Sequence, residues 1–259
     1  MKKALIVLEK EWLELRLQPM LLLATLVLPP LITAFAVAAF FVVGKISSGI
    51  SLPATPLPPE FAGLSLLEVG QAIVGKQFST LFLLLPIFIP SVLASYAIVG
   101  EKRERTLEPV LATPIRTWEL LLGKMLAALI PALGITIASA ALFVAGVLAF
   151  AVTDRVREVV VTPGWILAVL VDTPLLALIG VALIVVLSSR VNDPRTAQQI
   201  SAVLVVPVLG LLFGQLAGVI VLGPALALGI GVILAIIAAG ALWVATRLFQ
   251  REVILTKWR

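Results

Sequence analysis

Six long apolar stretches alternate with short polar segments along the chain. They lie at about residues 20–43, 77–99, 125–151, 164–187, 199–222 and 225–246. A helix that crosses a bilayer needs about 20 mostly apolar residues, and each of these stretches is long enough. Only one clear charge, that of Asp172, falls inside them. The pattern predicts an all-α, polytopic membrane protein with six transmembrane helices, in which residues 1–259 form a single domain.

Lysine and arginine predict how these helices are oriented, because positive charge is retained in the cytoplasm. Most of these residues lie before the first stretch, after the second, after the fourth and after the sixth. The other side carries only Lys45, Lys76, Arg155 and Arg157. We therefore expect both termini on the cytoplasmic side of the cytoplasmic membrane. The longest external connection is then residues 45–76, whose second half, residues 63–75, predicts a short helix on the outer surface.

The N-terminal residues 2–18 predict a helix that lies in the inner membrane interface. Apolar residues recur there at helical spacing while charged residues fall on other faces: Leu5, Leu8, Trp12 and Leu15, against Lys10, Glu11 and Glu14. Pro19 predicts a break before the first transmembrane helix. The alternative is a simple cytoplasmic extension of that helix.

Composition agrees with a membrane protein and narrows the chemistry. Hydrophobic residues make up 61% of the chain and the mean hydropathy is +1.18, against roughly 45–50% apolar residues in soluble domains. The sequence contains no cysteine and no histidine. It therefore lacks thiolate metal ligands and the commonest general base, which argues against an intramembrane enzyme. The formal charge of +5 is explained by membrane orientation, so nucleic acid is not an expected partner.

Residues 100–124, GEKRERTLEPVLATPIRTWELLLGK, concentrate charge between two apolar stretches. They include Glu101, Lys102, Arg103, Glu104, Arg105, Glu108, Arg116, Glu119 and Lys124. Burying these charges in lipid would cost on the order of 25 kcal/mol, so the segment must lie outside the membrane. Its spacing predicts an i,i+4 ion pair of Glu101 with Arg105 and a second helix that begins at Thr113-Pro114. A solvated loop without a partner is the alternative, although interleaved apolar residues favour packing on protein.

This segment resembles the signature of the ATP-binding-cassette type-2 permeases, the six-span export subunits. The matching residues are Thr106, Leu107 and Glu108, then Thr113, Pro114 and 119–124, whereas Arg105 stands where the family usually has glycine. The N-terminal LEKEWLELRLQP resembles the interfacial helix of the same family. The resemblance implies a coupling helix at residues 101–118 that contacts a separate ATPase subunit, through Glu101, Arg103, Glu104, Arg105, Leu107, Glu108, Thr113, Pro114 and Arg116.

The same resemblance implies the partners. The chain would act as a dimer, either of itself or with a sister permease, and would not be an enzyme. ATP and Mg would bind to the partner ATPase, so no cofactor is expected in this chain. Residues 188–199 would form a second, lesser contact through Arg190, Asp193 and Arg195, or an ordinary hairpin. An ion-gradient-driven secondary transporter is the alternative, but that class usually has internal repeats and several intramembrane charges.

Three further features of the sequence bear on function. Residues 70–77, GQAIVGKQ, nearly match a phosphate-binding loop but lack the hydroxyl residue and the preceding strand. Asp172 is a candidate substrate or proton contact, or a carboxyl that bonds a neighbouring helix. Gly210, Gly214 and Gly218 have the small-xxx-small spacing of a helix-packing face. The apolar stretches slightly favour a lipid-like or amphipathic cargo.

Overall fold

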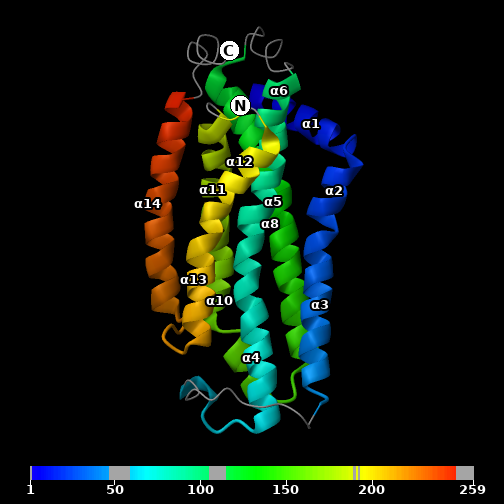
Figure 1. Ribbon diagram of the computed structural model, residues 1–259, viewed down its shortest axis with the longest axis vertical. Helices are drawn as coiled ribbons and strands as arrows, with labels where there is room; N and C mark the ends of the chain where they lie inside the picture. Colours follow the sequence, from blue (N-terminus) through cyan, green and yellow to red (C-terminus); the bar gives the residue numbers. More distant parts are fainter. Residues whose placement is uncertain (1, 47–58, 105–114, 189–190, 192, 249–259) are drawn as a thin grey trace.

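The computed structural model describes residues 2–46, 59–104, 115–188, 191 and 193–248. Within this part the fold is all-α, and six helices are long and apolar enough to cross a membrane, as predicted: Pro19–Val43, Leu66–Gly100, Thr117–Phe150, Pro163–Ser188, Pro194–Gln215 and Pro224–Leu248. They run roughly side by side in one bundle (Figure 1). The N-terminal helix and the C-terminal end of the sixth span lie at the same end of this bundle.

The first span consists of α2 (Pro19–Leu26) and α3 (Leu28–Val43), and it is preceded by a separate helix, α1 (Lys2–Arg16). The break at Pro19 is therefore as predicted, and α1 slopes across the end of the bundle (Figure 1). The third span is α8 (Thr117–Phe150), against which α1, α3 and α5 all pack.

The second span is longer than predicted. Helical structure runs without a gap through α4 (Leu66–Leu81), η2 (Phe82–Leu84), α5 (Leu85–Ala94), the π-helical η3 (Ser95–Gly100) and α6 (Glu101–Glu104). Ser65 caps its start, because its backbone N–H donates to Glu68 Oε2 at 2.7 Å and its hydroxyl accepts from the Glu68 N–H at 3.4 Å. The prediction of a separate surface helix at residues 63–75 is wrong. Residues 70–77 are helical and therefore form no phosphate-binding loop.

Gln71 explains why this segment belongs to the bundle. Its side chain is fully buried. It donates to the carbonyl oxygens of Phe40 at 3.1 Å and Phe150 at 2.9 Å, and it accepts from the Val152 N–H at 3.0 Å. These bonds join the ends of the first and third spans to α4. A surface helix would have left these backbone groups without this partner.

The remaining helices complete the bundle. A short helix, α9 (Asp154–Val160), follows the third span. The fourth span is α10 (Pro163–Leu167), the π-helical η4 (Ala168–Asp172) and α11 (Thr173–Ser188), and the sixth is α14 (Pro224–Leu248). α11 is the centre of the packing, since it contacts α5, α8 and α14.

The fifth span consists of α12 (Pro194–Ser201), η5 (Ala202–Leu204) and α13 (Val205–Leu216). It begins earlier than predicted because Asp193 accepts the Thr196 N–H at 3.2 Å and so caps the helix. It also ends earlier. Gly218 lies beyond the last helical residue with φ +70°, a backbone conformation that favours glycine. The assignment of Gly218 to a helical packing face is therefore wrong.

Candidate functional site

The candidate site lies where α1 crosses the start of α8, next to α6. Gly123 of α8 allows the close approach, because a Cβ at this position would lie 2.7 Å from the Ala4 carbonyl oxygen and 2.7 Å from Val7 Cβ. Trp12 Nε1 donates to the Ala127 carbonyl oxygen at 3.3 Å. These contacts fix α1 on the third span.

The buried face of α1 differs from the predicted one. Ala4, Val7, Leu8 and Glu11 are buried, whereas Leu5 is 56% exposed. Glu11 therefore lies on the packed face of the helix rather than on a solvated one. A carboxylate in such a place needs a compensating charge.

Lys124 of α8 provides that charge. Its side chain is 1% exposed, and its ammonium group donates to Glu11 Oε1 at 2.5 Å and to the Ala97 carbonyl oxygen at 2.7 Å. It also lies 2.7 Å from Glu101 Oε2. Lys124 therefore makes two hydrogen bonds and one further ion pair. One buried cation therefore joins α1, the second span and α8.

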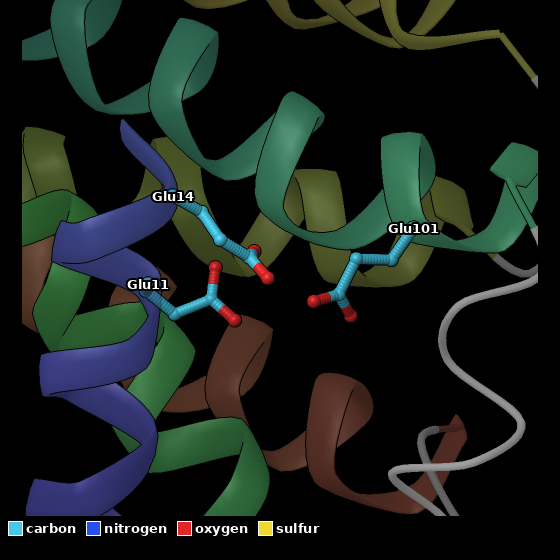
Figure 2. A group of neighbouring side chains, drawn as sticks. All are labelled: Glu11, Glu14 and Glu101. Carbon is cyan, nitrogen blue, oxygen red and sulfur yellow. The ribbon is translucent and has the colours of Figure 1, made fainter. Parts of the chain in front are cut away.

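A second cation completes this arrangement. Lys10 of α1 pairs with Glu101 and lies 2.8 Å from Glu14 Oε2 and 3.4 Å from Glu11 Oε1. We call Lys10, Glu11, Glu14, Glu101 and Lys124 the ion network. Its three carboxylates point toward one another from α1 and α6 (Figure 2).

The carboxylate oxygens lie within 4.8 Å of one another, a spacing that could suit a metal ion. However, the two ammonium groups already occupy the space and the lone pairs that a metal would need. Three negative groups face two positive groups, so one net negative charge remains. The arrangement is that of a structural ion network rather than a metal centre.

The electrostatics of the two buried carboxylates differ. Burial raises the pKa of Glu11, and the neighbouring Lys124 only partly offsets this effect. Burial would also raise the pKa of Glu101, but Lys124 and Lys10 together outweigh it and hold that pKa below its usual value. Burial would lower the pKa of Lys10, but its bonds to Glu101 and Glu14 raise it overall. Glu101 is thus the carboxylate that the two lysines keep charged.

A second, more exposed contact lies beside the ion network. Arg103 Nη1 of α6 lies 3.2 Å from Oδ1 of Asp193, and the side chains are 66% and 43% exposed. Gln198 Nε2 of α12 donates to Ser95 Oγ of η3 at 2.8 Å. The structure therefore brings together the ends of the second and fifth spans, including one residue from each predicted coupling segment.

The predicted coupling residues differ in their environments, and several of them lie outside the described part of the chain. Glu101 is buried in the ion network and pairs with Lys10 and Lys124. Its predicted partner Arg105 lies outside the described residues, as do Leu107, Glu108, Thr113, Pro114 and Arg190. Glu104 ends α6, while Arg103 and Arg195 are exposed.

The predicted helix start at Pro114 is wrong. Ile115 and Arg116 are not helical, and α8 begins at Thr117. The reason is a different cap, in which the carboxylate of Glu119 accepts the Arg116 N–H at 3.1 Å. The continuation of this helix through Trp118 into the third span is confirmed.

Asp172 and the glycines lie elsewhere in the bundle. Asp172 is 3% exposed in η4, and its Oδ1 has no hydrogen-bond partner among the described residues. A Cβ on Gly231 of α14 would lie 3.0 Å from this oxygen. Gly214 approaches Ile220, whereas nothing lies within 4 Å of a Cβ at Gly210. Asp172 thus sits where the fourth and sixth spans come close.

The fold and this site define a multi-spanning α-helical membrane protein with a polar helix junction at one end. The sequence profile described as "ABC-2 family transporter protein" matches residues 5–238. The chain therefore belongs to the ABC-2 family of transporter proteins. Members of this family are membrane transport components and are not themselves the ATPase. No curated protein matches the chain.

Proposed function

We propose that the chain is the permease subunit of an ATP-driven exporter in the cytoplasmic membrane. A separate ATPase subunit binds ATP and Mg, and two permease protomers, identical or related, enclose the transport path. Both termini lie in the cytoplasm. ABC-2 membership supports the permease assignment, and the distribution of Lys and Arg supports the orientation.

The observation that carries this proposal is the ion network. Glu101 lies at the end of the second span, immediately before the charged segment that would contact the ATPase. Lys124 of α8 and Lys10 of α1 each form an ion pair with Glu101. These pairs connect the end of the second span to both helices. A force on the charged segment would therefore act on three helices together, which is what a transmission element requires.

Association with an ATPase can be tested by charge reversal. Replacing Glu104 and Glu108 by Lys should abolish co-purification of the ATPase with the permease, because the negative charges expected at the contact would become positive. The matched control replaces Asp154 and Glu158 by Lys at the opposite end of the bundle, where both side chains are exposed. Survival of the complex in the first variant, or cargo transport by purified permease without an ATPase, would contradict the proposal.

Orientation can be tested independently, because the chain contains no cysteine. Arg103→Cys should resist a membrane-impermeant maleimide in intact cells, whereas Arg155→Cys should react. Both side chains are exposed in the structure, so the difference would report the side of the membrane. The reverse labelling pattern would overturn the assigned topology.

A further inference from the structure

Asp172 is a buried carboxyl group inside the fourth span. It is 3% exposed and ends the π-helical segment η4. It lies nine positions after Pro163, where the span begins, and sixteen positions before Ser188, where it ends. These separations correspond to roughly 14 Å and 24 Å of helix. Since the hydrocarbon core of a bilayer is about 30 Å thick, the carboxyl group lies within it rather than at either surface.

The helices that pack on η4 supply no cation close enough to offset the charge of Asp172. The main contacts of η4 are with α10, α11 and α14. Within these described segments the only charged residue is Arg247 of α14. It lies sixteen positions, or roughly 24 Å of helix, from Gly231, where α14 approaches Asp172. By contrast, the buried carboxylates Glu11 and Glu101 both pair with Lys124.

Hydrogen bonds do not compensate for this burial. Asp172 Oδ1 is buried and has no hydrogen-bond partner among the described residues. The adjacent hydroxyl, that of Thr173, donates to the Ala168 carbonyl oxygen at 3.4 Å instead. An isolated carboxylate in apolar surroundings is far more costly than the neutral acid, so such a group takes up a proton. The surroundings of Asp172 therefore favour its protonated form.

The packing around Oδ1 suits a proton better than any larger cation. A Cβ on Gly231 would lie 3.0 Å from this oxygen and 3.1 Å from Val171 Cγ1, so the backbone of α14 closes over the carboxyl group. An ammonium group would need the space that α14 occupies. A divalent metal ion would need several oxygen ligands, which the side chains of Val171 and Gly231 do not supply.

We propose that Asp172 is a proton-binding site, and that the sixth span packs on the fourth only while this carboxyl group carries its proton. The π-helical segment agrees with such a site, because π-helical turns occur frequently at functional positions. α14 is also the least buried of the six spans, and its main contacts are with α10, η4 and α11. Ionisation of Asp172 would therefore act on a helix that few other contacts hold in place.

Infrared spectroscopy of the purified full-length permease in nanodiscs tests whether the proton is bound. At about pH 8 ordinary carboxyl groups are ionised, so the C=O stretching band of a protonated acid should stand out. The sequence contains three aspartates, and the side chains of Asp154 and Asp193 are 85% and 43% exposed. The band should shift when aspartate carries carbon-13 at its side-chain carboxyl, and Asp172→Asn should abolish it. Asp154→Asn is the matched control and should retain it.

Cysteine protection tests the link to the sixth span, because the chain contains no other cysteine. Ala227 of α14 is 1% exposed, so Ala227→Cys in detergent micelles should react with N-ethylmaleimide only when α14 separates. Its rate is divided by that of Val232→Cys, an exposed position on the same helix, to remove the pH dependence of the thiol. Loss of one proton on separation should raise this ratio by up to about tenfold per pH unit. Asp172→Asn should remove the rise.

Two results would overturn the proposal. Absence of a protonated-acid band at about pH 8, or a band that aspartate labelling does not shift, would show that Asp172 is ionised. A pH-independent ratio of the two cysteine rates, or the same rise with and without Asp172→Asn, would disprove the link to the sixth span. If Asp172→Asn fails to fold, the isotope label and the rate ratio still decide both points in the unaltered background. Neither measurement includes an ATPase, so both are independent of the proposed export function.

Discussion

Replacing Lys124 by Met tests whether the ion network holds the three helices together. Methionine has a similar length, so packing changes little while the cation is lost. Glu11 and Glu101 then face each other with side chains only 3% and 7% exposed. Removing one partner of a buried ion pair typically costs about 3–5 kcal/mol, because the remaining charge is left uncompensated. We expect the free energy of unfolding to fall by about this amount.

The pH dependence of this loss has a definite sign. Burial already raises the pKa of Glu11, and without Lys124 it should rise further. A carboxyl whose pKa is higher in the folded state binds more protons when folded, so it destabilises the protein as the pH rises. The deficit of the variant should therefore shrink as the pH falls toward the raised pKa of Glu11, by up to about 1.4 kcal/mol per pH unit.

The measurement is SDS-induced unfolding of purified protein in mixed micelles, followed by far-UV circular dichroism. Lys45→Met is the matched control, because it makes the same chemical change at an exposed position and should cost less than about 0.5 kcal/mol. Adding Glu11→Gln to Lys124→Met restores the net charge of the network and should recover a large part of the loss. A loss below about 1 kcal/mol in Lys124→Met would refute the reasoning, as would no recovery in the double variant.

Three further stability predictions use the same unfolding assay. Gly123→Ala should cost about 1–3 kcal/mol because its Cβ would meet α1 at 2.7 Å, whereas Gly134→Ala on the same helix meets nothing within 4 Å and should be nearly neutral. Gly231→Ala should cost more than Gly229→Ala on the same helix, because its Cβ would lie 3.0 Å from Asp172 Oδ1 whereas a Cβ at Gly229 meets nothing within 4 Å. Gln71→Leu should cost at least about 1–3 kcal/mol, because the buried amide supplies an acceptor to the Val152 N–H. Equal effects within either glycine pair would contradict the close contacts.

The six spans could be predicted because the signal is local. Each span contains an apolar run that is long enough to cross a bilayer, and this run can be recognised without knowledge of the rest of the chain. The exact ends of the helices depend on capping side chains, which the average hydrophobicity of a stretch of sequence does not reveal. Ser65 with Glu68 and Asp193 with Thr196 each extend a helix beyond its apolar run.

The ion network could not be predicted because its partners are far apart in sequence. Glu11 and Lys124 are separated by 113 positions, so no local spacing pairs them. The apolar spacing of α1 also placed Glu11 on a solvated face, since an acidic residue is rarely buried. The only usable signal was that Glu11 lies four positions after Val7 and three after Leu8, on one face of the helix.

The contacts around α6 differ in strength, and this difference indicates where the bundle can move. The ion network is buried, so separating its charges would leave them uncompensated at a cost of several kcal/mol. The Arg103–Asp193 pair is largely exposed, and such surface pairs are worth about 0–1 kcal/mol. A displacement of α6 should therefore carry α1 and the start of α8 with it, whereas the exposed pair of Arg103 with Asp193 can separate at little cost. A cleft of about 420 Å³ between the second and fifth spans lies along that weaker boundary, so its width would change when the two groups of helices move apart.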